Sequence, residues 1–327
     1  MEGEWIIKGT PRMHERPIYP LVNTLKALGA EIDYMEKEGY PPLKIRGKKL
    51  KGGEVFLSGN ISSQFVSALL MIAPIMENGL TIHLENEIIS RPYIHLTLGL
   101  MKEFGVHSKW VDRDIVVKHQ SYTSKPFYVE SDWSAASYWY QMVSLIEGSE
   151  VKLLGLNQNS LQGDANLVNL FMDVGVSTEF IPDGVIIRHV KRRGKKFFHD
   201  FVNEPDLVQT FVVDCCLKNI KFLFSGVQSL KIKETDRIEA LKTEMRKLGY
   251  VLRADELHML EWDGERVDPQ ENPVISTYKD HRMAMSFAPA CISIGSITID
   301  EPEVVTKSYP EFWEDIKTAG FQIKESE

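Results

Sequence analysis

The sequence predicts an α/β protein of two domains, built from a unit of about 70 residues that recurs along the chain. A helical pattern that ends in a glycine and leads into an apolar strand occurs five times in the 327 residues. The glycines are 76, 70, 74 and 71 residues apart, at Gly29, Gly105, Gly175, Gly249 and Gly320. Glycine suits the position because it readily takes the left-handed conformation that ends a helix.

Each period also contains a second passage from a helix to a strand. The helices are expected at residues 62–75, 134–146, 206–217 and 282–294, and the strands at 80–84, 151–154, 222–224 and 297–299. A helix followed by glycine and a strand is common in any α/β protein, so the first feature alone is weak. Two features with one spacing favour a repeated β-α-β-α-β(β) unit. Five units are an odd number for a protein of matched halves, which indicates that one is missing.

A polar segment at residues 122–126, which contains Lys125-Pro126, predicts the domain junction. We therefore expect an N-terminal domain of residues 1–125 and a C-terminal domain of residues 126–327.

The composition is that of an ordinary globular protein, with 43% hydrophobic and 26% charged residues and a net charge of −8. Nucleic acid is an unexpected partner because its binding requires a basic face. The longest apolar run, residues 68–76, is too short to span a bilayer, so no membrane partner is expected. Glu2, Glu4 and Lys8 interrupt the apolar core that a signal peptide at the N-terminus would need.

The cysteines, Cys215, Cys216 and Cys291, predict a reducing compartment, and we expect a cytoplasmic protein. They do not form the CxxC spacing typical of zinc sites, and no metal is expected.

Several expected helices begin with polar or cationic residues although their bodies are apolar. Ser62, Ser63 and Gln64 open the first of them. Free N–H groups and the helix dipole make such a start a phosphate site, but simple capping by a serine explains the same residues. Both interpretations stay open.

The segment Lys-Glu-Thr-Asp-Arg at residues 233–237 precedes an amphipathic helix that runs to Leu248. Asp236 is expected to cap this helix together with Glu239, which leaves Lys233, Glu234 and Arg237 without a structural task. A solvated run of charges is the alternative. The preceding strand and turn favour a site at the strand ends.

Further cations occupy comparable positions. Arg282 follows Asp280-His281 at the start of an apolar helix, where a cation opposes the helix dipole unless it holds an anion. Lys307 precedes the last helix, and Arg12 and Arg16 lie near the N-terminus. The glycine-rich nucleotide loops are absent from the sequence. The residues thus indicate an enzyme or binding protein for small polyanions.

Six segments in order resemble the EPSP synthase family of shikimate-pathway enolpyruvyl transferases. They are PRMHERP at residues 11–17, SSQF at 62–65, SRPY at 90–93, KETDR at 233–237, DHRMA at 280–284 and the segment around Lys307. The resemblance implies a two-domain enolpyruvyl-transferase fold in which each domain consists of three β-α-β-α-β-β units and closes on the substrates. The N-terminal domain of this chain would then be incomplete.

The resemblance also implies an activity. The family transfers the enolpyruvyl group of phosphoenolpyruvate to the 5-hydroxyl of shikimate 3-phosphate and releases phosphate, in chorismate and aromatic amino acid biosynthesis. The expected partners are these two small molecules; no cofactor is implied, and we expect a monomer.

Residue roles follow from the same resemblance. The residues implied for shikimate 3-phosphate are Ser62, Ser63, Gln64, Ser90, Tyr93, Asp206, Ser229 and Lys233. Those implied for phosphoenolpyruvate are Arg16, Gln64, Arg237, Arg282 and Lys307. Asp206 would accept the hydroxyl proton, and Glu234 and Lys307 are both candidates for protonating the methylene carbon. Ser229 stands where some members have asparagine.

The family's opening segment, with its Lys-Ser pair, an arginine and an Asn-containing Gly-Thr loop, has no counterpart before Pro11. We therefore expect the chain by itself to be poorly active, with an exposed apolar face in its N-terminal domain; an inactive fragment or a ligand-binding remnant is the alternative. A UDP-N-acetylglucosamine enolpyruvyl transferase would be expected to carry a reactive loop cysteine. An RNA 3′-phosphate cyclase would need a nucleotide site and a basic surface.

Overall fold

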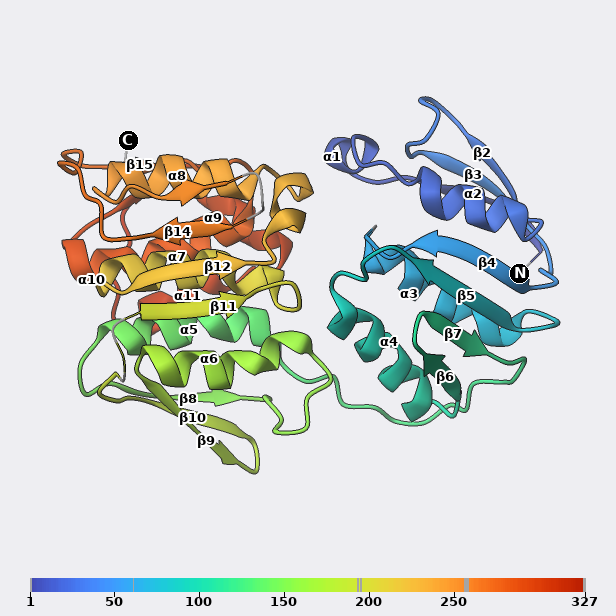
Figure 1. The fold of residues 1–327 in the computed structure, drawn as a ribbon, viewed down its shortest axis with the longest axis horizontal. Helices are drawn as coiled ribbons and strands as arrows, with labels where there is room; N and C mark the ends of the chain where they lie inside the picture. Colours follow the sequence, from blue (N-terminus) through green and yellow to red (C-terminus); the bar gives the residue numbers. More distant parts are fainter. Residues whose placement is uncertain (1, 61, 193, 195, 256–258, 326–327) are drawn as a thin grey trace. The chain divides into compact units, whose positions relative to one another are not determined.

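The computed structural model describes residues 2–60, 62–192, 194, 196–255 and 259–325. The chain forms two compact units, Met1–Tyr128 and Val129–Glu327 (Figure 1). In the described part of the chain, none of the helices combines the length and apolar composition that crossing a membrane requires.

The N-terminal unit begins with a small antiparallel sheet. Its elements are β1 (Gly3–Ile7), α1 (Pro11–His14), α2 (Tyr19–Ala27), β2 (Glu31–Tyr34) and β3 (Leu43–Gly47), and the strand order is β1-β3-β2. Val22, Ile32 and Leu43 form its core. Trp5, Ile6 and Ile7 of β1 are about half exposed.

The rest of this unit is a four-stranded mixed sheet with two helices. Its elements are β4 (Gly53–Ser58), α3 (Ser63–Ile72), η1 (Ala73–Ile75), β5 (Leu80–Glu85), α4 (Arg91–Glu103), β6 (Ser108–Val111) and β7 (Asp114–Val117). The order is β4-β5-β7-β6, and β4 and β5 are parallel. The buried residues of β5 alternate along the strand, as expected when one face of a sheet packs on helices.

The C-terminal unit starts with a three-stranded antiparallel sheet. Its elements are α5 (Trp133–Leu145), β8 (Glu150–Leu154), η2 (Gly163–Asn166), α6 (Leu167–Val174), β9 (Val176–Ile181) and β10 (Gly184–His189), in the order β8-β10-β9.

The next segment repeats the arrangement found around β4. Its elements are β11 (Lys196–Asp200), η3 (Pro205–Leu207), α7 (Val208–Leu217), β12 (Lys221–Ser225), η4 (Gln228–Ile232), α8 (Arg237–Lys247), β13 (Arg253–Ala254) and β14 (Leu260–Trp262). The order β11-β12-β14-β13, with β11 and β12 parallel, matches β4-β5-β7-β6. The predicted repeat of β-α-β-α-β-β units is confirmed in these two segments.

The chain ends with a two-stranded parallel sheet and short helices. The elements are β15 (Val274–Ile275), α9 (His281–Phe287), η5 (Ala288–Ala290), α10 (Cys291–Ile294), β16 (Thr298–Ile299), η6 (Pro302–Lys307) and α11 (Phe312–Thr318). The prediction of a strand after Gly320 is wrong, because residues 321–325 form no strand. A strand requires a partner for its backbone groups, and β15 and β16 pair only with each other among the described residues.

Three helices, α5, α7 and α9, form the centre of the C-terminal unit. Helix α7 packs against both α5 and α9, and every one of its residues is buried. Its sequence is apolar nearly all round, which is typical of a helix enclosed by other elements. The starts of these three helices position the candidate site.

Candidate active site

Each central helix of the C-terminal unit starts with an aspartate, and the three aspartates are spaced evenly. Asp132 caps α5, Asp206 lies in η3 directly before α7, and Asp280 caps α9. Asp132 accepts a hydrogen bond from the backbone N–H of Ser134 at 2.7 Å, and Asp280 accepts one from that of Arg282 at 2.9 Å. Such caps satisfy N–H groups that have no partner within the helix.

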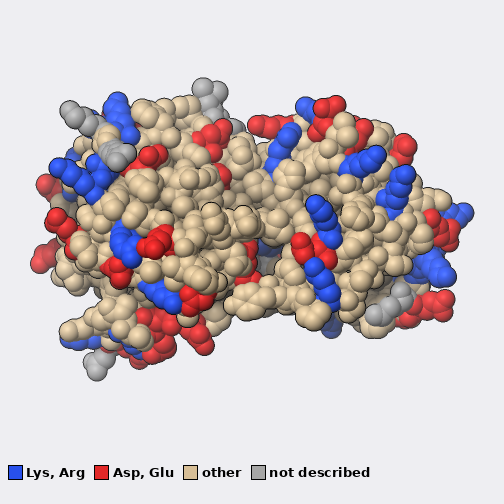
Figure 2. All heavy atoms as spheres, turned by 90° about the horizontal axis from the view of Figure 1, so that it is seen from below, with Lys and Arg blue, Asp and Glu red and all other residues tan. Residues whose placement is uncertain are grey.

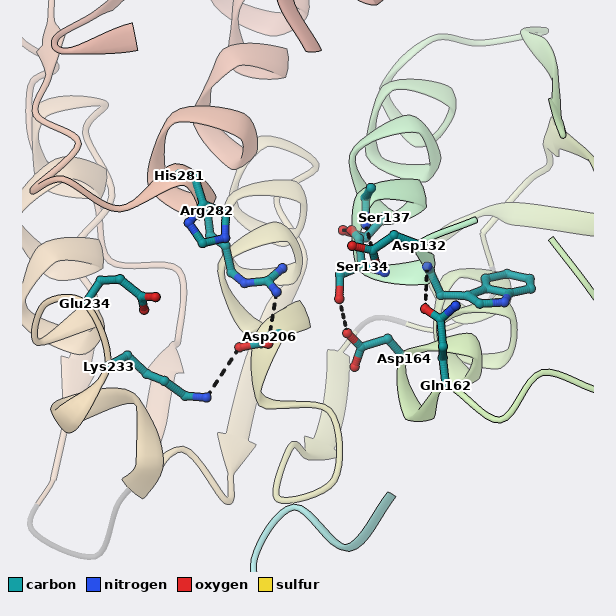
Figure 3. Close-up of polar contacts among 12 residues, drawn as sticks. Asp132, Ser134, Ser137, Gln162, Asp164, Asp206, Lys233, Glu234, His281 and Arg282 are labelled. Carbon is teal, nitrogen blue, oxygen red and sulfur yellow. Dashed lines mark hydrogen bonds and ion pairs between the residues drawn. The ribbon is translucent and has the colours of Figure 1, made fainter. Parts of the chain in front are cut away.

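Asp206 is the centre of a group of ion pairs (Figure 3). Its carboxylate lies 2.9 Å from Nη2 of Arg282, 3.1 Å from Nη1 of Arg237 and 3.6 Å from Nζ of Lys233. Burial by itself would raise the pKa of Asp206, but the charges of these three cations hold it well below its ordinary value. Asp206 is therefore ionised at neutral pH.

Arg237 links Asp206 to two further carboxylates. Its Nε lies 2.6 Å from Asp280, and its Nη2 lies 2.9 Å from Glu234. The side chain is 2% exposed, and Asp280 is fully buried. The structure thus places Arg237, which the resemblance assigns to phosphoenolpyruvate, inside a network of three carboxylates.

Glu234 joins the network to Lys307. One oxygen of Glu234 accepts from Arg237, and the other accepts from the Lys307 ammonium group. Burial opposes its ionisation, yet Arg237 and Lys307 lower the pKa of Glu234 to about 2. Glu234 is therefore ionised at neutral pH in the ligand-free protein.

We call these residues the ion-pair cluster: Asp206, Lys233, Glu234, Arg237, Asp280, Arg282 and Lys307. Its four cations exceed its three carboxylates, so the ligand-free cluster has an excess of positive charge. His281 adds none, because burial and the neighbouring Arg282 lower its pKa to about 4. Such a cluster suits an anionic ligand.

Elsewhere the surface charges are mixed. Figure 2 shows Lys and Arg interspersed with Asp and Glu on the face in view. In the part of the chain that the structure describes, no three His, Cys, Asp or Glu side chains are grouped so as to hold a metal ion. The excess of positive charge in the ion-pair cluster is thus a local feature, in contrast to the mixed charges of the surface in view.

In the N-terminal unit, two helices begin at one edge of the sheet. Helix α3 follows β4 and α4 follows β5, and these strands are parallel. The connecting loops contact each other, since the Gly59 N–H donates to Glu85 O at 2.6 Å and the Ile89 N–H donates to Gly59 O at 3.2 Å. This arrangement brings the Ser62, Ser63 and Gln64 segment near the start of α4.

The start of α4 has an unusual backbone. Ser90 occupies the N-cap position without a capping side-chain hydrogen bond, and its φ of 55° lies in the left-handed region that a serine rarely adopts. It is 7% exposed, and Tyr93 follows it in the first helical turn. Backbone strain of this kind concentrates at functional sites, and Ser90 is a residue that the resemblance assigns to a phosphate.

The remaining predicted residues lie on short connecting segments. Arg16 lies in the turn between α1 and α2 and is half-buried, and its backbone N–H donates to Met13 O at 3.2 Å. Ser229 lies in η4, a short helix that ends directly before Lys233. The structure thus brings Ser229 into the segment that leads to the ion-pair cluster.

Sequence reasoning missed a buried carboxyl group and its donor. Asp164 of η2 is 4% exposed and accepts a hydrogen bond from Ser134 Oγ. The sequence also did not suggest a role for Asp280, which forms an ion pair with Arg237. One signal was available for Asp280. Asp132 and Asp206 are 74 residues apart, as are Asp206 and Asp280, which marks the three as equivalent positions of the repeat. No comparable signal marks Asp164.

Comparisons with known proteins identify the family. The family described as "EPSP synthase (3-phosphoshikimate 1-carboxyvinyltransferase)" matches residues 1–316. The chain belongs to the EPSP synthase family. A 3-phosphoshikimate 1-carboxyvinyltransferase of Bacteroides fragilis is 55% identical over 326 residues, which are 99% of this chain and 80% of that relative. One of Vibrio campbellii is 38% identical over 319 residues, 97% of this chain and 74% of that relative.

The fold agrees with solved EPSP synthases. The structure of EPSP synthase from Acinetobacter baumannii superimposes with a TM-score of 0.77 at 23% identity, covering 99% of this chain and 75% of that one. At this identity the likeness shows the fold, which is the expected enolpyruvyl-transferase fold of the family.

Proposed function

We propose that this EPSP synthase family member transfers the enolpyruvyl group of phosphoenolpyruvate to the 5-hydroxyl of shikimate 3-phosphate and releases phosphate. The observation that carries the proposal is the Asp206 carboxylate, which is ionised at the start of α7 and bordered by Arg282, Arg237 and Lys233. Joining a hydroxyl group to an anionic substrate requires a base that accepts the hydroxyl proton and cations that stabilise the negative charge, close to one another.

Asp206 is proposed as the proton acceptor. As the hydroxyl oxygen bonds to the central carbon of phosphoenolpyruvate, its proton passes to the Asp206 carboxylate. The cations that lower the pKa of Asp206 also make it a weak base. Anionic substrates engage the same cations, and their charges would restore part of the basicity of Asp206 when they are bound.

Lys307 and Glu234 are proposed to handle the second proton. Protonation of the methylene carbon creates positive charge at its neighbour, which the hydroxyl oxygen attacks; a proton then leaves the resulting methyl group as phosphate departs. Because Glu234 is ionised and Lys307 donates to it, the pair already contains one proton that can be given and taken back.

Anion recognition is proposed for both units. Ser62, Ser63, Gln64, Ser90 and Tyr93 of the N-terminal unit would bind shikimate 3-phosphate, supported by the two helix starts at one sheet edge. Lys233 and Ser229 would bind the same substrate. Arg16, Arg237, Arg282 and Lys307, together with Gln64, would bind phosphoenolpyruvate. The enclosure of Arg237 by carboxylates makes its role mainly that of orienting Asp206 and Glu234.

We further propose that the protein acts in the cytoplasm as a monomer on these two small molecules. The free thiols of Cys215, Cys216 and Cys291 are consistent with a reducing compartment.

Phosphate release by the purified protein tests the proposal. We expect release only when both substrates are present, and a decrease of about 10²- to 10⁴-fold for Asp206→Asn. Asp173→Asn, on the exposed side of α6, is the matched control and should retain the wild-type rate. Release that needs only one substrate, or that survives Asp206→Asn, would contradict the proposed role.

The rival activity on UDP-N-acetylglucosamine is disfavoured by the cysteines. Cys215 and Cys216 lie fully buried in α7, and burial raises the pKa of both thiols well above the ordinary value. Burial also raises the pKa of Cys291. Thiols in such surroundings are poor nucleophiles.

A further inference from the structure

Asp164 is a buried acidic residue beside the ion-pair cluster that none of the proposed substrate contacts uses. Its Oδ2 accepts a hydrogen bond from Ser134 Oγ. Its Oδ1 is buried and has no hydrogen-bond partner among the described residues. A buried carboxyl group that is only half satisfied is costly to retain, which calls for an explanation other than packing.

The local structure fixes Asp164 near Asp206. Helix α5 packs against both η2, which carries Asp164, and η3, which carries Asp206. The side chain of Asn166 in η2 also donates to Glu204 at 2.9 Å, two residues before Asp206. Figure 3 shows Asp164 on the α5 side of Asp206, with its carboxyl group turned toward Ser134.

The charges around Asp164 come from three helix starts. Burial raises the pKa of Asp164 to about 7, and the negative charges of Asp206 and, more weakly, Asp132 raise it too. Ser134 and the positive charge of Arg282 act in the opposite direction. Two carboxyl groups that interact within one enclosed site titrate as a pair.

We propose that Asp164 is a positioning residue that acts through Asp206, because the charge on its carboxyl group sets how strongly Asp206 holds a proton. Neutral Asp164 leaves Asp206 under the influence of the three cations alone. Ionised Asp164 adds a negative charge on the opposite side and makes Asp206 a stronger base. This inference rests on the proposed function of Asp206, but the coupling of the two residues can be measured without any substrate.

The first experiment follows the aspartate carboxyl groups of the ligand-free protein by ¹³C NMR across pH. We expect one carboxyl resonance that titrates near neutrality and is absent from Asp164→Asn. Asp206→Asn should move this titration to lower pH, because it removes a negative neighbour. Ser134→Ala should move it to higher pH, because it removes the donor that stabilises the ionised form.

Ser137→Ala is the matched control. Ser137 lies one turn further along α5 and is buried; its hydroxyl group bonds to Thr210 Oγ1 and to the backbone carbonyl of Ser134, and no bond to Asp164 is found among the described residues, so its removal should leave the titration in place. Coupling is refuted if no carboxyl group titrates near neutrality, or if Asp206→Asn leaves the titration unchanged. Should Asp164→Asn fail to fold, the shift in Ser134→Ala still identifies the resonance as that of Asp164, and Asp206→Asn still tests the coupling.

The second experiment measures phosphate release against pH. In the wild type we expect kcat to rise through the pH range in which Asp164 ionises, and we expect this step to be absent from Asp164→Asn and displaced upward in Ser134→Ala. Identical profiles in wild type and Asp164→Asn would overturn the positioning role. Absence of release by the wild type would instead overturn the proposed function, while the NMR titrations would still decide the coupling.

Discussion

At the scale of single residues, Arg237 is the most enclosed cation of the ion-pair cluster. Its guanidinium group contacts Asp206, Glu234 and Asp280, at distances between 2.6 and 3.1 Å. The planar fork of arginine can serve three carboxylates at once, which a lysine ammonium group on a flexible chain cannot do with the same geometry. Arg237 therefore orients both the proposed base and the proposed proton-transfer pair.

Arg237→Met is expected to destabilise the protein strongly. Removing the cation leaves the carboxyl group of Asp280 buried without its ion-pair partner, which typically costs about 3–5 kcal/mol of unfolding free energy. Urea unfolding measures the change. The double variant Arg237→Met/Asp280→Asn should recover part of the loss, whereas Arg246→Met, on the exposed face of α8, should change stability by less than about 0.5 kcal/mol. Equal effects of the two arginine substitutions would contradict this view.

The low pKa of Glu234 leads us to expect that the stability of the protein decreases in acid. Its pKa falls from 4.5 to about 2 on folding, so its contribution to stability is complete above pH 4.5 and is lost as pH falls toward 2. This corresponds to roughly 3 kcal/mol at most. Glu234→Gln should therefore unfold less steeply than the wild type between pH 4.5 and 2. Glu239→Gln, at an exposed position of α8, should follow the wild-type curve.

At the scale of elements, a seam of polar side chains joins the three central helices. Ser137 Oγ of α5 lies 3.1 Å from Thr210 Oγ1 of α7, which lies 3.4 Å from Ser286 Oγ of α9. The Gln141 side chain of α5 donates to Ser286 O at 3.0 Å. Such bonds between buried side chains help to fix the register of the three helices. The register in turn brings the helix starts, and thus the ion-pair cluster, together.

Gln209 of α7 takes no part in this seam. It is fully buried, and neither polar atom of its amide has a hydrogen-bond partner among the described residues. Gln209→Met, which keeps the volume, should raise the unfolding free energy by about 1–2 kcal/mol. Gln141→Met is the control and should lower it, because a bond to α9 is lost. A lower stability of Gln209→Met in urea unfolding would show that the amide has partners after all.

At the scale of the whole molecule, each unit has hydrophobic cores of its own. Leu69 belongs to a core formed by α3, α4 and the β4–β7 sheet, and Phe211 belongs to one centred on α7. Separate cores allow a local loss of stability to remain within one unit.

Core truncations are expected to act on one unit at a time. Leu69→Ala should accelerate amide hydrogen exchange within Met1–Tyr128, and Phe211→Ala should do so within Val129–Glu327. The expected losses are about 2–5 kcal/mol for the leucine and about 3–5 kcal/mol for the phenylalanine. Hydrogen exchange followed by mass spectrometry resolves the units. Uniform acceleration in both units by either variant would refute separate stabilities.

The sequence by itself determined the repeat, the family and most of the proposed site residues. Glycines such as Gly175 and Gly249 mark helix ends through backbone preference, which is local and therefore readable. Charged residues at helix starts, such as Glu234 and Arg282, are visible for the same reason. The strand expected after Gly320 failed because a strand depends on a partner, and a local pattern does not reveal whether one is available.

Only the tertiary structure decided which charges meet. Asp206 pairs with Arg282 across 76 residues of sequence, and Arg237 pairs with Asp280 across 43. Asp164 and Ser134 form a hydrogen bond across 30 residues of sequence, and no local sequence pattern indicates that they pair. These contacts exist because α5, α7 and α9 pack side by side and present their starts to one another. Ionisation follows from that packing: the neighbouring cations hold Asp206 ionised in spite of its burial, whereas burial and the charge of Asp206 raise the pKa of Asp164.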